Sequence, residues 1–227
     1  MSKTTLAISL FALTAIGRQQ LGTGAPGSVA PFPLQEERMF IEHNVSLGEA
    51  VVRVEAESEE ELDRIQVDKP DGEQLFALAA PTGKTRGLSG FEIELDEDSL
   101  ASVLATYAAG DYDIHARTAD GRAAEGSARL SLDLPPAPQL IYPQDGAVDV
   151  PTSGLVVRWH PDRWASGYHV QMEQGESDGL AIQVPPGRNS LRIPDGLLAR
   201  GTATQLEIAA IGPGGNRTVI GVHFTTQ

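Results

Sequence analysis

Hydrophobic and polar residues alternate along the last part of the chain, in runs typical of β-strands with one buried face. The first run places Leu155, Val157 and Trp159 at alternate positions. Later runs continue the same period, with apolar positions at Tyr168, Val170, Met172, Leu206, Ile208, Ala210, Ile220, Val222 and Phe224. A period of two puts successive side chains on opposite faces of a sheet. The pattern therefore predicts β-strands throughout residues 135–227.

Residues 38–134 alternate in shorter segments, most of them bounded by Gly, Pro, Asp or acidic clusters. Strands are predicted at residues 40–45, 50–56, 64–68, 74–79, 91–95, 110–116 and 126–132. The sequences at 69–72 (KPDG) and 120–121 (DG) favour turns, because Pro presets φ and Gly tolerates a positive φ. The acidic stretch at 59–63 fits a loop or a single helical turn between strands equally well.

One short helix is predicted between these strands. Its apolar stripe recurs at helical spacing and consists of Leu100, Val103, Leu104 and Tyr107. Either Asp96 or Asp98 can cap the first turn, and Gly110 ends the helix. The helix therefore interrupts an otherwise β-rich segment.

The order of the motifs in residues 135–227 resembles a fibronectin type III domain. Trp159 lies on the predicted second strand, Tyr168 opens the third, and Gly201-Thr202 precedes the alternating run before the last hairpin. The resemblance implies a β-sandwich, but such sandwiches host many unrelated roles.

Two departures from that family bear on the expectations. Thr204 stands where the family has its corner Tyr, and Trp164 could fill the space that the missing ring leaves. The hairpin at 211–217 (IGPGGNR) lacks an Arg-Gly-Asp sequence, so integrin-type adhesion has no support.

The segment after the predicted helix (GDYDIHA, residues 110–116) resembles the late strands of immunoglobulin-like bacterial surface domains, in which the Tyr lies where the chain crosses between sheets. In this chain that residue is Tyr112. Together the two resemblances imply an all-β fold of two tandem sandwiches. An immunoglobulin-like sandwich with one short helix is expected at 38–134, and a fibronectin type III-like sandwich at 135–227.

The segments outside these domains have distinct compositions. Residues 1–17 form a candidate signal peptide, because Lys3 precedes an apolar stretch too short to span a bilayer and small residues surround a possible cleavage site before Arg18. A buried first strand would have a similar sequence. Residues 18–37 are rich in Gly and Pro and are expected to form a flexible tether. The Pro-rich sequence at 134–138 is expected to form an extended spacer that holds the two domains apart.

Composition excludes several classes of protein. The chain has 227 residues, a net charge of −14 and no Cys. Disulfides, thiolate metal sites and a cysteine nucleophile are therefore excluded. The net negative charge disfavours nucleic acid and anionic lipid as partners, because phosphate binding needs clustered Lys and Arg. Once the signal is cleaved, no transmembrane span is expected.

No sequence pattern predicts a reaction. The five His residues are scattered, and no nucleophile elbow, phosphate loop or dinucleotide motif is present. The acidic clusters at 55–61 and 96–98 lack the spacing of a calcium loop. Strand carboxylates such as Glu92, Glu94 and Glu207 alternate with apolar neighbours and are expected to face water. We therefore predict no catalytic residues, no metal ligands, no cofactor and no enzymatic activity.

Three classes of function remain open. The favoured one is a non-catalytic extracytoplasmic protein, periplasmic or secreted, that binds a protein or glycan or spaces other elements through the loops and edges of its sandwiches. The alternatives are an accessory subunit of a secreted enzyme or surface complex, and a hydrolase on a β-scaffold. The predicted binding residues are Arg163 and Trp164 in one loop and Asn216 and Arg217 in another. Trp164 could instead be packed into the core.

The N-terminal pattern generates a first prediction. Protein isolated from its native host is expected to begin at or near Arg18, because the apolar stretch has the length and flanking residues of a secretory signal. Mass spectrometry of the intact chain measures this directly. An uncleaved terminus in a cytosolic fraction would show that the localisation is wrong.

Overall fold

The structure is a computed structural model that describes residues 31–80, 88–175 and 178–227. The expected signal peptide and residues 18–30 of the expected tether lie outside the described residues. The rest of the tether segment is largely strand, because β1 (Phe32–Pro33) pairs with β7 and β2 (Gln35–Asn44) begins two residues later. No helix of the described residues is long and apolar enough to cross a membrane.

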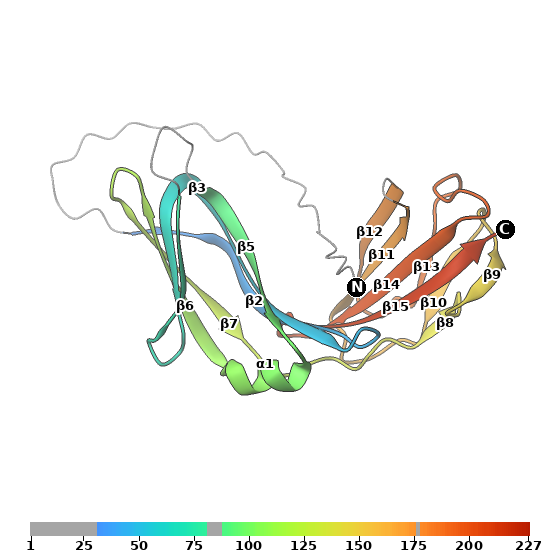
Figure 1. The fold of residues 1–227 in the computed structure, drawn as a ribbon, viewed down its shortest axis with the longest axis horizontal. Helices are drawn as coiled ribbons and strands as arrows, with labels where there is room; N and C mark the ends of the chain where they lie inside the picture. The colour runs from blue at the N-terminus through green and yellow to red at the C-terminus, as the bar shows by residue number, and fades with distance from the viewer. Residues whose placement is uncertain (1–30, 81–87, 176–177) are drawn as a thin grey trace.

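The described residues form two β-sandwiches, shown side by side in Figure 1. The first sandwich contains β1, β2, β3 (Glu49–Asp68), β4 (Gln74–Ala79), β5 (Leu88–Glu97), α1 (Leu100–Thr106), β6 (Gly110–Thr118) and β7 (Ala123–Leu130). The second contains β8 (Leu140–Tyr142), β9 (Ala147–Val150), β10 (Val156–Trp159), β11 (Gly167–Gln174), β12 (Asp178–Val184), β13 (Ser190–Arg192), β14 (Ala203–Ile211) and β15 (Arg217–Thr226). The predicted all-β class with one short helix is confirmed.

One long strand, β3, connects both layers of the first sandwich. Residues 49–57 of β3 pair with β2 and β5, whereas residues 62–68 pair with β4 and β6. The expectation of a loop or helical turn at 59–63 is wrong, because the acidic stretch lies within β3 at the point where its pairing partners change. The two strands predicted on either side of that stretch are therefore parts of one strand.

Arg122 partly neutralises this acidic stretch. Its two terminal guanidinium nitrogens donate to the carboxylate of Glu60 over 3.1 and 2.9 Å. These charge-assisted hydrogen bonds lower the pKa of Glu60, with the charge of Arg122 acting in the same direction. The bidentate pair stabilises an extended backbone where the sequence alone suggested a solvated loop.

The N-cap of α1 lies one residue after Asp98 and three residues after Asp96, the two predicted caps. Ser99 is the N-cap, and its hydroxyl accepts a hydrogen bond from the backbone N–H of Ser102 at 3.2 Å. The prediction of an aspartate cap is therefore wrong. Val103 and Tyr107 are buried as expected, but Leu104 is 41% exposed because it lies beyond the buried face of so short a helix.

Tyr112 follows at the start of β6, and its hydroxyl donates to the carbonyl of Ala108 at 3.1 Å, which fixes the crossing into that strand.

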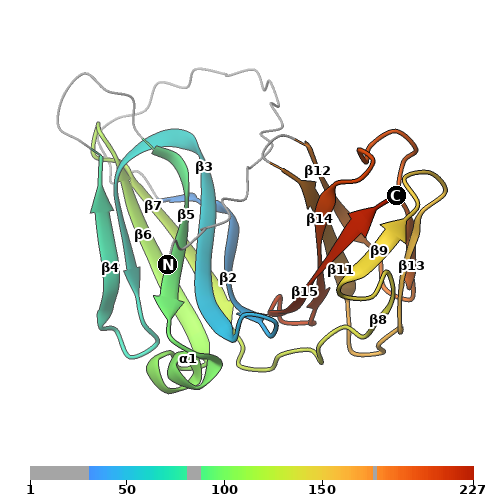
Figure 2. The same ribbon diagram turned by 45° about the vertical axis from the view of Figure 1, so that its right-hand side comes forward.

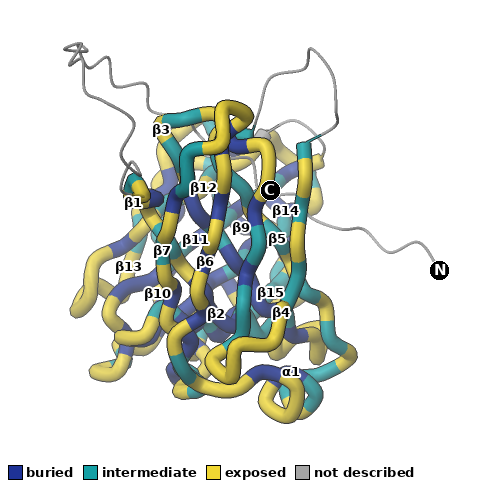
Figure 3. Tube along the Cα trace, turned by 90° about the vertical axis from the view of Figure 1, so that its left-hand side faces the viewer, coloured by how far each residue is buried: buried dark blue, intermediate teal, exposed yellow. Residues whose placement is uncertain are grey.

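The second sandwich places a three-stranded sheet, β13-β10-β8, against the sheet β12-β11-β14-β15, and β9 pairs with the outer part of β15. Along β10 and β11, buried residues alternate with more exposed ones, as the period of two predicted. Figure 3 shows buried, intermediate and exposed residues interspersed along the strands of the molecule. The predicted core is confirmed, since one buried cluster includes all six of its residues, Trp159, Tyr168, Val170, Leu206, Ile208 and Phe224.

A polar contact replaces the family's corner Tyr. Thr204 is buried, and its hydroxyl accepts from the side-chain amide of Gln174 at 2.7 Å. The same amide group of Gln174 accepts from the backbone N–H of Ala199 at 2.7 Å. The expectation that Trp164 fills the vacated space is wrong, because that ring is 62% exposed.

The packing of Trp159 generates a second prediction. Its ring is fully buried, lies 5.3 Å from that of Tyr168 in an edge-to-face arrangement, and holds its indole N–H without a hydrogen-bond partner. Packing alone therefore keeps the ring in place. Trp159→Ala is expected to reduce the free energy of unfolding of this sandwich by about 3–5 kcal/mol. Chemical denaturation measures the change.

Trp164→Ala is the matched control for this experiment, because it removes the same side chain from an exposed position. It is expected to change the free energy of unfolding by less than about 0.5 kcal/mol. Equal effects of the two substitutions would contradict the burial of Trp159.

Candidate functional site

The two sandwiches meet in a junction built from β2, β15 and the Pro-rich linker (Figure 2). β2 and β15 run parallel and pair in register at Glu42 with Arg217, His43 with Thr218 and Asn44 with Val219. The backbone N–H of Val45 donates to the carbonyl of Val219 at 2.9 Å and extends this ladder by one bond. Two edge strands thus cover each other, and one sheet continues from the first sandwich into the second.

Asn216 lies at the centre of the junction and is fully buried. Its side-chain oxygen accepts from the backbone N–H of Ile41 at 2.8 Å. Its amide nitrogen donates to the carbonyls of Ser131 and Asp133 at 2.7 and 2.9 Å. One side chain therefore joins β2, the segment after β7 and the loop before β15.

Arg217 continues the junction with charge and stacking. Its guanidinium lies over the ring of Phe40, 4.2 Å from the centroid, and donates to Glu42 at 3.3 Å. Arg53 donates to the other carboxylate oxygen of Glu42, also at 3.3 Å. Burial lowers the pKa of the neighbouring His169, and the charge of Arg217 lowers it further. His169 is therefore neutral near pH 7 and adds no positive charge beside Arg217.

The linker is part of this contact and does not hold the sandwiches apart. The hydroxyl of Thr218 donates to the carbonyl of Pro135 at 2.6 Å. A Cβ atom on Gly214 would lie 2.9 Å from the side chain of Ser131, so the loop before β15 approaches the end of the first sandwich as closely as a glycine permits. The expected separating role of the Pro-rich sequence is therefore wrong.

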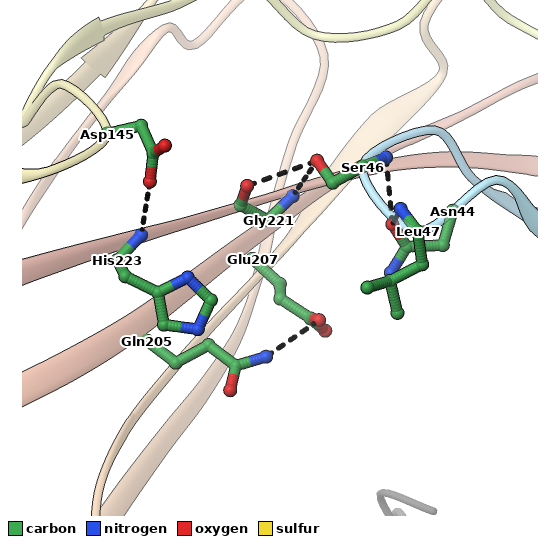
Figure 4. A pocket seen from close by; sticks show the side chains of 8 residues that line it. All are labelled: Asn44, Ser46, Leu47, Asp145, Gln205, Glu207, Gly221 and His223. Carbon is green, nitrogen blue, oxygen red and sulfur yellow. Dashed lines mark hydrogen bonds between the residues drawn. The ribbon is translucent and has the colours of Figure 1, made fainter. Parts of the chain in front are cut away.

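An open cleft of about 370 Å³ lies beside the junction, and Figure 4 shows its lining. Its walls come from the turn after β2, the turn before β9 and the outer faces of β14 and β15, through Asn44, Ser46, Leu47, Asp145, Gln205, Glu207, Gly221 and His223. Leu47 is an exposed apolar residue in an otherwise polar lining. The cleft therefore has the composition of a polar binding surface with one apolar contact.

Glu207 is the electrostatically unusual group of the cleft. Burial raises the pKa of its carboxyl, and the charges of Glu42 and Glu173 raise it further, while a hydrogen bond from Gln205 at 3.1 Å opposes the shift. This corrects the expectation that Glu207 simply faces water, because its environment is partly desolvated. A raised carboxyl pKa in a cleft occurs at catalytic sites, but catalysis also requires a second group within reach of the reacting atom.

Two other polar residues of the cleft, Ser46 and Asp145, are used in structural contacts. The hydroxyl of Ser46 donates to the carbonyl of Gly221 at 3.1 Å and accepts from its N–H at 2.9 Å (Figure 4). The carboxylate of Asp145 accepts from the backbone N–H of His223 at 2.9 Å. Among the described residues that line the cleft, no nucleophile is hydrogen-bonded to a base, and no group of metal-binding side chains is present in the described part of the chain.

The structure separates the four predicted binding residues into two places. Asn216 and Arg217 lie in the junction, where their side chains contact other parts of the chain. Arg163 and Trp164 are both exposed and lie together in the loop between β10 and β11. No local sequence pattern distinguished the loop that packs in the junction from the loop that faces solvent, because both kinds of loop contain the same turn residues.

The loop that carries Trp164 is held rigidly at its base. The backbone N–H of Asp162 donates to the hydroxyl of Tyr168 at 2.9 Å, and the carboxylate of Asp162 accepts from the N–H of Trp164 at 2.7 Å. Ser166 fixes the other end, since its hydroxyl donates to the carbonyls of Ile211 and Gly212 at 2.9 and 3.0 Å. An exposed aromatic ring on a loop fixed in this way loses little conformational entropy on contact with a partner.

Comparison with known proteins finds solved structures that are similar to this chain at low sequence identity. No family model matches the chain, and no curated protein matches it. A two-domain fibronectin type III segment of chicken tenascin is 11% identical, covering 85% of this chain and 99% of that one, with a TM-score of 0.31. The fibronectin(III)-like modules of Clostridium thermocellum CbhA are 13% identical, covering 86% and 93%, with a TM-score of 0.35.

A third solved structure, a tetra-tandem repeat in the extending region of a large adhesion protein, is 12% identical and covers 84% of this chain and 49% of that one, with a TM-score of 0.31. The likeness is thus to fibronectin type III domains and to domains of bacterial surface proteins, as the sequence resemblance implied. At these identities and scores it carries no argument about function. The sandwich assignment follows from the strand order itself.

The junction generates a third prediction. Asn216→Ala would leave the N–H of Ile41 and the carbonyls of Ser131 and Asp133 without their partner. We expect the free energy of unfolding to fall by about 2–4 kcal/mol, because buried unpaired backbone groups are costly. Small-angle X-ray scattering is expected to show a wider range of distances between the two sandwiches.

Asn189→Ala is the control, since Asn189 is an exposed asparagine of the second sandwich. It is expected to leave both stability and scattering unchanged. If Asn216→Ala behaved in the same way, Asn216 would not be the residue that joins the sandwiches.

Proposed function

We propose that this protein is a non-catalytic, extracytoplasmic module that binds a protein or glycan partner and holds its two sandwiches at a fixed mutual orientation. The observation that supports this function most strongly is the buried junction around Asn216, which joins the sandwiches through hydrogen bonds, a shared sheet and an ion pair. In a tandem module with a buried junction, the position and orientation of one domain determine those of the other, whereas a flexible linker leaves them independent. The extracytoplasmic location rests on the signal-like sequence of residues 1–17.

The loop between β10 and β11 is the proposed binding surface. Trp164 is 62% exposed on a loop whose backbone is fixed at both ends. Arg163 is exposed beside it. Trp and Arg are the residue types that most often contribute large shares of binding energy at interfaces, because each combines apolar area with a polar or charged group. A rigid loop that presents both is a suitable anchor for a partner.

The cleft supports binding more than chemistry. It contains one carboxyl with a raised pKa, but the hydroxyl of Ser46 is used by the backbone of Gly221. Hydrolysis by this cleft would require a second catalytic group acting together with Glu207, and the other titratable side chains of the lining are those of Asp145 and His223. A binding or spacing role needs no such group.

A fourth prediction tests this function. Mature wild-type chain, immobilised and exposed to surface extract from its native host, is expected to retain a protein or glycan that the double variant Arg163→Ala, Trp164→Ala retains at least about tenfold less. Fluorescence provides a second readout. Trp159 is buried and Trp164 exposed, so contact over the loop is expected to shift the emission of Trp164 to shorter wavelength.

Leu104→Ala serves as the control, because Leu104 is a partly exposed apolar residue on α1 of the other sandwich. It is expected to retain the partner as the wild type does. Equal retention by all three chains would reject the loop as the binding surface. Turnover of an ester, glycoside, peptide or phosphate substrate that is lost on Glu207→Gln would reject the non-catalytic function.

A further inference from the structure

β4 and β12 each expose an unpaired edge in the same continuous sheet. β4 pairs with β3 alone, and β12 pairs with β11 alone. Each therefore directs one row of backbone N–H and C=O groups away from the sheet. β4 belongs to the first sandwich and β12 to the second (Figure 2), so the two free edges lie on different sandwiches of one molecule.

Both edges lack the features that normally prevent strand pairing. β4 has the sequence QLFALA, and β12 continues after Asp178 as GLAIQV, so neither segment contains a charged residue or Pro. Their outward residues include the exposed Ala77 in β4 and Ala181 in β12, which leave flat faces beside the edges. Short uncharged segments of this kind readily accept another strand.

The other described strands that pair with a single strand are protected. β5 carries Glu92, Glu94, Asp96 and Glu97. β9 contains Asp149, whose φ of 58° departs from the extended geometry of a strand. β1, β8 and β13 are only two or three residues long. Among the described strands with a single partner, β4 and β12 are thus the ones that lack such protection.

We propose that β4 of one molecule pairs with β12 of a second copy of this chain, so that the sheet continues from molecule to molecule. The chain already joins its own sandwiches by the pairing of two edge strands, β2 and β15, in this same sheet. β4 is six residues long, and the part of β12 after Asp178 is also six residues long. Because both of these segments are uncharged, their pairing opposes no like charges, although the chain as a whole carries a net charge of −14. A contact between two different surfaces is head-to-tail, so it builds an open chain of molecules, or a ring where the rotation between copies closes.

The acidic character of the chain determines how this association depends on salt. Two copies with a net charge of −14 repel each other, and added salt screens that repulsion. Association is therefore expected to strengthen as the salt concentration rises, the reverse of an interface held by opposite charges.

Two single variants and their mixture test the proposal by sedimentation velocity and light scattering. Wild-type chain is expected to form species larger than a monomer as concentration and salt increase. Ala77→Lys and Ala181→Lys each place a charge beside one edge and are expected to weaken self-association by about tenfold or more. Mixing the two variants is expected to restore a one-to-one dimer, because each retains the edge that the other has lost.

His115→Lys is the matched control, because it adds a lysine at an exposed position of β6, which lies between two paired strands. It is expected to associate as the wild type does. Thermal unfolding of each variant verifies that it is folded, and hydrogen exchange in the wild type is expected to slow at the amides of β4 and β12 on association.

Three results would overturn the proposal. They are a wild type that stays monomeric at every concentration and salt, a mixture of the two variants that stays monomeric while the wild type associates, and an association abolished by Ala181→Lys but unaffected by Ala77→Lys. The last would indicate pairing of β12 with β12. A monomeric protein would leave the proposed binding function untouched, because that function depends on Trp164 and the junction.

Discussion

The arrangement of the molecule depends on one buried side-chain amide. Asn216 pairs its single oxygen and both amide hydrogens with backbone groups of three separate segments. Those backbone groups lie where the sandwiches meet, so each would otherwise lose water without gaining a partner. The pairing of β2 with β15, the bond from Thr218 to Pro135 and the stacking of Arg217 on Phe40 all surround this amide. A tandem of two sandwiches becomes a single unit because the loop before β15 is docked there.

Charge limits where an acidic chain can bring its two halves together. Glu42, on the strand that joins the sandwiches, lies between Arg53 and Arg217 and receives a hydrogen bond from each. Arg53 also forms ion pairs with Glu92 and Glu94. This network sets two guanidinium groups against three carboxylates and so partly neutralises the face of the first sandwich beside the junction, whereas Glu207 on the second sandwich is left with a raised pKa. The junction is thus the place where basic side chains offset the repulsion between carboxylates.

The sequence predicted what depends on neighbours along the chain. Alternation located the strands and the buried core around Trp159, because burial of one face and a period of two are local properties of a strand. Alternation gave a wrong prediction where pairing between residues that are distant in the sequence determines the local structure. The acidic stretch within β3 is extended because β5 and β6, from far along the chain, pair with β3 next to residues 58–61, and Arg122 binds Glu60 within that stretch. The partners of Asn216 lie 175, 85 and 83 residues away, a separation that no local pattern encodes.

Some loops and strand edges of one sandwich are covered while others are exposed, and the difference depends on which of them the rest of the chain contacts. The loop before β15 and the loop before β11 contact each other through Ser166, yet the first is buried against another sandwich and the second exposes Trp164. The same holds for the edges. β2 and β15 cover each other and β5 is protected by its carboxylates, whereas β4 and the part of β12 after Asp178 each have one uncharged edge without a described partner strand. A protein whose own fold uses edge pairing cannot leave matching uncharged edges exposed without also offering them to other strands. The surfaces available for contact are therefore those that the junction does not use.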